Sequence, residues 1–117
     1  MSVAGGWHIY PEMAAAGLWT TAHDIARVGV AVMRALRGEA SCLGLSRESL
    51  AEMLRPQLPD HVAGSDFVGL GWFCYGADDA FRFGHAGWNE GFLADARFYP
   101  ATGQGAVVIL NSNQGWP

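Results

Sequence analysis

The sequence predicts an α+β fold in which an antiparallel sheet of about four strands is flanked by helices. Apolar residues recur with helical periodicity in the first half of the chain, whereas the second half alternates in the manner of strands. The connections between the expected strands are short, which favours antiparallel neighbours, and the elements show no βαβ alternation. With 117 residues, the chain has the length of one domain. We expect a loop and two helices in residues 1–56, and strands in residues 67–112.

The first expected helix follows an ordered loop over residues 3–19. Thr21 and Asp24 match a helix start, since a hydroxyl can accept an early backbone N–H and an acid is favourable at the positive helix end. Gly38 is a typical C-terminal stop. The apolar stripe between them consists of Ile25, Val28, Gly29, Val32, Met33 and Leu36.

A shorter helix is expected from Ser46, with Leu50, Met53 and Leu54 facing inward. Pro56 ends it. Residues 56–66 are rich in Pro, Asp, His and Gly, which is typical of a surface connection.

Four segments have the composition of strands. In the third, Phe92, Ala94, Ala96 and Phe98 share one face, and the opposite face is more polar. The segment Ala106–Leu110 is apolar throughout, which predicts a central strand. The expected strands cover residues 69–75, 80–85, 90–99 and 104–110.

Composition and charge exclude several classes of protein. Half of the residues are hydrophobic, so we expect a globular body with a core. The net charge is -4 and the chain lacks lysine, so no basic stripe is available for nucleic acid. No apolar run approaches the roughly 20 residues of a membrane span, and the first residues do not show the basic, apolar and small-residue order of a signal peptide. Because Met1 leads directly into a Gly-Gly-Trp sequence, we expect the chain to be a truncated piece.

Motifs for nucleophilic or metal chemistry are missing. The serines stand in no G-x-S-x-G elbow, and an S-x-x-K motif requires a lysine. The four histidines are scattered without metal-ligand spacing, so we expect no metal and no cofactor. We expect Cys42 and Cys74 to be free, buried thiols.

The segment Gly84–Gly91 is unusually rich in glycine for the junction of two strands. Two interpretations fit its residues. In the first it is a hairpin turn, in which Gly87 and Asn89 supply positive φ and His85 merely continues a strand face. In the second, glycine marks the close approach of a ligand that Trp88 and Asn89 contact.

Two segments resemble elements of the β-lactamase and penicillin-binding-protein superfamily. Phe83-Gly-His-Ala-Gly-Trp-Asn-Glu-Gly-Phe92 resembles its third conserved element, in the His-x-Gly form of class C-like esterases, where it replaces Lys-Thr-Gly. Ala15-Ala-Gly-Leu-Trp-Thr-Thr-Ala-His-Asp-Ile-Ala-Arg27 resembles the turn that leads into a family helix. The two matches occur in the family order and together span most of the chain.

The resemblance implies an active-site strand. His85, Ala86 and Gly87 would face the substrate, with Asn89 beside them, and the backbone N–H of Trp88 would complete an oxyanion hole. His85 would bind the catalytic tyrosine or the substrate and could assist proton transfer. Substrates would be small esters, amides or β-lactams.

Departures from the family pattern limit what the chain can do alone. Neither Ser-x-x-Lys nor Tyr-x-Asn occurs, so we expect a single partial domain, the C-terminal portion of a serine hydrolase, to be inactive by itself. A C-terminal helix is also expected to be missing, and uncovered apolar faces would favour homo-oligomers or strand exchange. The alternative is a non-catalytic binding or self-assembly module of the same fold. The sequence leaves the compartment open, although relatives with cell-wall substrates act outside the cytoplasm.

The remaining aromatic and charged residues have structural interpretations. We expect the tryptophans outside the Gly84–Gly91 segment to be packing residues, Asp78 and Asp79 to form a turn, and Asp95 and Arg97 to form a surface ion pair. These tryptophans are Trp7, Trp19, Trp72 and Trp116.

Overall fold

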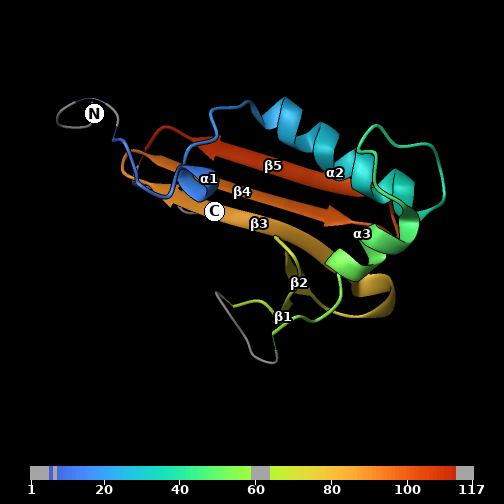
Figure 1. Ribbon diagram of the computed structural model, residues 1–117. Coiled ribbons are helices and arrows are strands. Elements are labelled where there is room, and N and C mark those ends of the chain that lie inside the picture. Colours follow the sequence, from blue (N-terminus) through green and yellow to red (C-terminus); the bar gives the residue numbers. More distant parts are fainter. Residues whose placement is uncertain (1–5, 7, 59–63, 113–117) are drawn as a thin grey trace.

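A computed structural model describes residues 6, 8–58 and 64–112 (Figure 1). It confirms the α+β class: five antiparallel strands form one sheet in the order β1-β2-β3-β4-β5, and α2 and α3 lie against one face. The elements are α1 (Met13–Ala16), α2 (Ala22–Leu36), α3 (Arg47–Met53), β1 (Phe67–Val68), β2 (Phe73–Tyr75), the 3-10 turn η1 (Asp78–Ala80), β3 (Arg82–Asn89), β4 (Phe92–Tyr99) and β5 (Gln104–Leu110).

Both predicted helices, α2 and α3, begin at the expected caps. The Thr21 side chain accepts the Asp24 N–H at 3.1 Å, and the Ser46 hydroxyl accepts the Ser49 N–H at 3.1 Å. Helix α2 ends just before Gly38, whose φ of 78° is the left-handed conformation expected of a stop glycine. Local chemistry therefore defines the helix boundaries.

The stripe on α2 is correct in outline. Val32 and Met33 are buried, whereas Val28, which belongs to the same apolar stripe, is 40% exposed. Gly29 has a clear reason to be glycine, because an added Cβ would lie 2.0 Å from the Phe98 ring on β4. The helix therefore packs directly on the centre of the sheet.

The core lies between α2, α3 and the near face of β3 and β4. Phe83 and Phe98, opposite each other in the β3–β4 ladder, are 0% and 1% exposed, and their rings are 5.4 Å apart. Leu50 of α3 and Cys74 of β2 complete this cluster. The end of the sheet beneath the helices is thus closed.

Residues 8–19 differ from the loop expected over residues 3–19, of which residues 3–5 and 7 lie outside the described part of the chain. A short helical turn, α1, occupies Met13–Ala16 and is closed by the Gly17 N–H, which donates to the Met13 carbonyl at 2.8 Å. Its run of alanines has high helix propensity, which explains a turn that the irregular apolar pattern concealed.

The sheet has one more strand than the four predicted segments. Phe67 and Val68 form a separate strand that pairs with β2; they lie within the region 67–112 expected to form strands, but ahead of the first predicted segment, residues 69–75. The β3–β4 turn is also displaced from its expected position: β3 continues through Asn89, and the turn is Glu90-Gly91, with Gly91 at φ 83°. The residues expected to form the connection therefore belong to a strand.

The position predicted for β5 is wrong. It is an edge strand, and along it only Val107 and Leu110 are even half-buried. An apolar run indicates a strand suited to burial, but it does not say which neighbour supplies that burial. Within the part of the chain that the structure describes, nothing pairs with its outer edge.

Candidate active-site groove

The central feature of the site is an open edge of β3. Strand β2 pairs with β3 only at Arg82, Phe83 and Gly84, so the same edge continues from His85 to Asn89 with no strand partner among the described residues. Figure 1 shows this stretch as the end of β3 that extends past β2. The segment singled out in the sequence therefore lies on an exposed sheet edge.

The register shows which backbone groups point to that edge. The Cys74 carbonyl accepts from Asp66 N–H at 2.9 Å on the β1 side, so the neighbouring β2 residues point toward β3 and face Gly84 and Arg82. Backbone direction alternates along a strand, with N–H and C=O of one residue on the same side. Ala86 and Trp88 consequently direct their N–H groups to the open edge.

A groove of about 1040 Å³ runs along this end of the sheet, between β3 and the segment that contains α1. All five predicted site residues line it: His85, Ala86, Gly87, Trp88 and Asn89. Its other walls include His8, Tyr10, Glu12, Leu18, Trp19, Trp72, Glu90 and Phe92.

The backbone at Gly87 and Asn89 tests the hairpin-turn interpretation of the glycine-rich segment. Gly87 does not adopt positive φ, and Asn89 does not either, so the hairpin-turn explanation is wrong. A Cβ added to Gly87 would meet nothing within 4 Å, whereas one added to Gly84 would lie 1.9 Å from the Ala96 carbonyl oxygen. The packing of the sheet therefore leaves no room for a side chain at Gly84. At Gly87 there is room for one, and the glycine leaves this part of the groove surface without a side chain.

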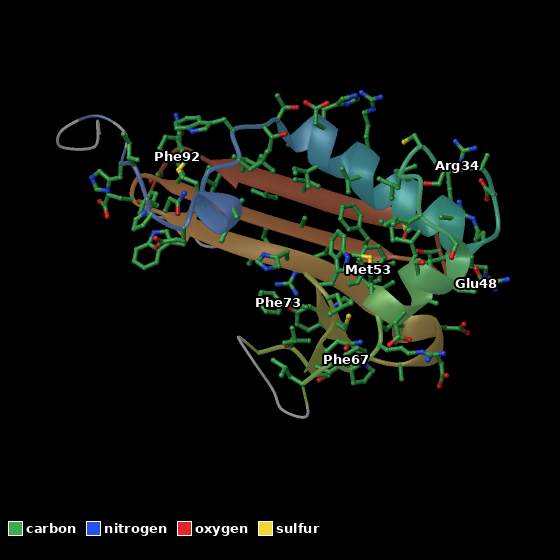
Figure 2. All side chains as sticks on the ribbon, viewed as in Figure 1. Arg34, Glu48, Met53, Phe67, Phe73 and Phe92 are labelled. Atoms are coloured by element: carbon green, nitrogen blue, oxygen red, sulfur yellow. The ribbon has the colours of Figure 1, made fainter. Side chains whose placement is uncertain are left out.

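The His85 side chain is held by a ring contact and remains accessible to solvent. Its ring stacks on Phe73 of β2, with centroids 4.6 Å apart and planes 19° from parallel, while the residue as a whole is exposed. Figure 2 shows Phe73 where β2 meets the middle of β3. Phe73 thus orients the imidazole, a role that no motif in the sequence indicated.

Exposed aromatic side chains line the turn end of the groove. Trp88 and Trp19 are each 68% exposed, and Trp19 meets Phe92 edge-on at 5.6 Å. Trp19 therefore packs on Phe92 at the edge of the groove and not in the core. Trp72 does pack, edge-on against Phe83 at 5.0 Å. Trp7 and Trp116 lie outside the described residues.

Two hydrogen bonds tie the segment around α1 to the β3–β4 turn. The Asn89 side-chain amide donates to the Ala16 carbonyl at 2.9 Å, and the Glu90 N–H donates to the Tyr10 hydroxyl at 3.1 Å. Asn89 therefore builds the wall of the groove through its amide nitrogen. These contacts span most of the chain, so local sequence patterns could not indicate them.

The groove walls described here include no serine and no cysteine; the hydroxyl side chains along them are those of Tyr10 and Thr20. Serines elsewhere serve the fold, as when the Ser41 hydroxyl donates to the Ala31 carbonyl at 3.1 Å. Within residues 8–58 and 64–112, no three His, Cys, Asp or Glu side chains gather as a metal site would require.

The far face of the sheet carries a separate charged cluster. Arg97 Nε lies 2.8 Å from Asp95, which confirms the predicted ion pair, although Asp95 is only 15% exposed. The guanidinium groups of Arg97 and Arg82 lie over the Tyr75 ring, 4.4 and 4.7 Å from its centroid. Asp78 and Asp79 form the turn η1, as expected.

The two cysteines differ in burial. Cys74 is buried as predicted, and burial raises the pKa of its thiol to about 11. Cys42 is exposed, so the expectation of a buried thiol is wrong there. Both are free.

Comparison with known proteins gives one family and a shared fold. A family model described as Beta-lactamase matches residues 2–117. A solved structure titled "Crystal structure of SurE" superposes with a TM-score of 0.66 at 22% identity, covering 79% of this chain and 21% of that one. "Crystal structure of SurE with D-Leu" gives 0.63 at 20% identity, covering 79% and 22%. The chain thus spans about a fifth of these proteins' length. No curated protein matches, and no helix in the described ranges is long and apolar enough to cross a membrane.

Proposed function

The chain belongs to the beta-lactamase family, and we propose that it forms one wall of the active site of a serine hydrolase. The hydrolase would cleave an ester, amide or β-lactam bond through an acyl-enzyme. The observation that supports this most is the edge of β3 that has no strand partner among the described residues; it borders the groove and directs the backbone N–H of Trp88 outward.

The Trp88 N–H would act as an oxyanion-hole donor. A strand fixed by pairing with β4 holds this N–H rigidly, so it needs no rearrangement when charge develops on a carbonyl oxygen. Loss of one such donor costs roughly 2.7–4 kcal/mol of transition-state stabilisation in enzymes where it has been tested. The bare surface at Gly87 would let the acyl group approach this strand.

His85 would orient the substrate or a neighbouring catalytic hydroxyl. Its ring is fixed by Phe73 and still exposed, as a hydrogen-bonding group in a binding site must be. Ala86 and Gly87 would contact the substrate directly. Asn89 would contribute mainly by holding Ala16 and thereby the opposite wall.

The nucleophile would come from a Ser-x-x-Lys segment beyond these 117 residues, since the chain contains no lysine. We expect the chain alone to be inactive. The test is hydrolysis of a chromogenic short-chain ester and a chromogenic cephalosporin, by the chain alone and after addition of the upstream portion of its parent protein.

Activity that appears only on reconstitution supports the proposal, and activity of the chain alone would contradict the need for an external nucleophile. In the reconstituted enzyme, His85→Ala should lower kcat/KM at least about tenfold with unchanged folding. His23→Ala, on α2 and outside the groove lining, is the matched control. Equal activity of both variants would remove His85 from the site.

A second candidate is self-assembly, favoured by the edge strand β5. This strand carries no charged residue and no proline, the features with which edge strands usually resist pairing. Pairing of β5 with a second copy would cover it. Val108→Lys should then lower the dimer fraction in sedimentation velocity, while Leu70→Lys, beyond the opposite end of the sheet, should not. A strictly monomeric wild-type chain would exclude this candidate.

A further inference from the structure

We infer that the outer edge of β5 pairs with β5 of a second copy of this chain, antiparallel and with Val107 on the two-fold axis. The inference rests on the second candidate function above, self-assembly, and adds its register and its side-chain contacts. In such a pair the two sheets become one continuous sheet, and the two α2 helices lie on the same face of it.

The ladder determines which backbone groups of β5 are available for pairing. In β3 the even-numbered residues from 82 to 88 direct their N–H and C=O groups away from β4, so the odd-numbered residues bond to β4. The same alternation, carried across β4, directs the groups of the even-numbered residues 104–110 toward β4. Gly105, Val107 and Ile109 therefore direct theirs outward, where no strand pairs with them among the described residues.

A two-fold axis at Val107 uses all of these outward groups. Val107 then pairs with the partner's Val107, and Gly105 pairs with the partner's Ile109, so the whole of β5 lies opposite itself. An axis at residue 106 or 108 keeps the same alternation but shortens the overlap and leaves outward groups unpaired at the strand ends. The register with the most backbone hydrogen bonds is therefore the one centred on Val107.

The side chains along this edge fit the same register. Gly105 lies opposite Phe98 in the ladder, on the face of the sheet that α2 covers. Beside this glycine a cleft of about 360 Å³ opens between β5 and α2, and its lining includes Ala26 and Val30. The partner's Ile109, a side chain that is 38% exposed in one copy, would stand opposite Gly105 and extend into this cleft.

Helix α2 provides a second contact. It lies along β5 (Figure 1), and Val30, which is 47% exposed, lines the cleft on the outer side of the strand together with Ala26. The two-fold axis places the partner's α2 antiparallel to it, so the two helix dipoles oppose each other favourably. Small side chains such as these let two helices approach to about 8–10 Å.

The size of this surface predicts a weak dimer. The 15 residues of α2 and the 7 residues of β5 have similar lengths, about 22 and about 23 Å. A side of that length and two layers deep would bury roughly 1,000 Å² over both copies, somewhat less than the about 1,200–2,000 Å² of stable complexes. We therefore expect dimers at micromolar or higher concentrations of the chain.

Sedimentation velocity over a series of concentrations tests the helix contact. Val30→Glu would place a carboxylate between the two helices and should raise the dissociation constant of the dimer at least about tenfold. Val28→Glu is the matched control, because Val28 belongs to the same helix, is 40% exposed and lines the groove instead of the cleft. It should leave the dissociation constant within about twofold of the wild-type value. Thermal unfolding of both variants checks that the fold is retained, and equal effects on the dimer would overturn the inference.

Disulfide cross-linking tests the register, in a Cys42→Ser background because Cys42 is exposed. Val107→Cys would bring two thiols to paired positions whose Cα atoms lie about 5.5 Å apart, within reach of a disulfide. Gln104→Cys would place them at opposite ends of the paired strands, about 20 Å apart, and should remain uncross-linked under the same mild oxidant. Faster cross-linking of Gln104→Cys, Ala106→Cys or Val108→Cys than of Val107→Cys would overturn the register.

Failure of this inference can be told apart from failure of the functions proposed above. A strictly monomeric wild-type chain would refute self-assembly and the inference together. A dimer that Val108→Lys weakens and Val30→Glu does not, without cross-linking at residue 107, would refute the inference and retain self-assembly. The hydrolase proposal is judged separately, by hydrolysis after reconstitution.

Discussion

The two ends of strand β3 have similar composition, but one end is buried and the other is exposed. At the first end Phe83 is fully buried beneath the helices, and Gly84 is pressed against the Ala96 carbonyl. At the other end Trp88 is 68% exposed and Gly87 has open space above it. Both ends pair with β4 in one continuous ladder, so pairing cannot account for the difference. The helices and β2 cover one end only, which shows that what surrounds a strand decides whether its residues stabilise the fold or form a site.

The strongest test of this contrast is removal of an aromatic ring from each end. Phe98→Ala should lower the free energy of unfolding by about 3–5 kcal/mol, because it leaves a cavity beneath Gly29. Trp88→Ala should cost less than about 1 kcal/mol, since the indole is mostly in water. Urea titration followed by circular dichroism measures both. Comparable losses would mean that the open end also belongs to the core.

The two glycines provide a finer test with one added methyl group each. Gly84→Ala should destabilise the fold by about 1–3 kcal/mol, because the new Cβ would overlap the Ala96 carbonyl oxygen and force the strands apart. Gly87→Ala should be neutral within about 0.5 kcal/mol in thermal unfolding, yet it should weaken ligand binding to the groove. The contrast fails if Gly87→Ala destabilises as much as Gly84→Ala.

The hydrogen bonds at the open end of β3 should stabilise the segment of residues 8–20 and little else. Tyr10→Phe removes the acceptor of the Glu90 N–H and should cost about 1 kcal/mol. Hydrogen–deuterium exchange of residues 8–20 should increase, whereas exchange in α2 should not. Tyr99→Phe, which removes a hydroxyl from β4 away from the groove, serves as the control. Unchanged exchange of residues 8–20 in the Tyr10 variant would show that the segment is held by other contacts.

The last comparison concerns the thiol at the closed end. At pH 8 a thiol reagent should titrate only Cys42 in the native protein, and Cys74 as well in urea. Burial raises the pKa of Cys74 to about 11 from an ordinary value near 9, so the unfolded chain loses this proton first as the pH rises. Stability should therefore fall between pH 9 and about 11 and be constant in this respect below pH 9. The Cys74→Ala variant should show a shallower decline over the same interval, and an equal decline would assign the effect to other groups.

The parts of the fold that depend on neighbouring residues could be predicted well from the sequence. The caps at Thr21 and Ser46 were identified correctly because a cap satisfies backbone groups only a few residues away. The antiparallel sheet followed from short connections. The edge position of β5 could not be predicted, because an apolar strand shows its preference for burial and not the identity of its partner.

The site was only partly foreseeable for the same reason. The resemblance pointed to residues 85–89, and all of them line the groove. Phe73 under His85 and Tyr10 at Glu90 were missed, because each contact joins segments that only the folded chain brings together. The turn was placed near Gly87 since glycine-rich sequence suits many turns, while the register that selects Gly91 is set by pairing along the whole of β3 and β4.

The order of the strands in the sheet is the order of the strands in the chain. Each strand can therefore be added to its predecessor by closing a short hairpin, which keeps the entropy lost at each step small and favours rapid folding. The bonds from Asn89 to Ala16 and from Tyr10 to Glu90 join residues 73 and 80 positions apart and can form only once that meander exists. We expect the groove to be completed last during refolding and to open first under denaturant, before the sheet itself is lost.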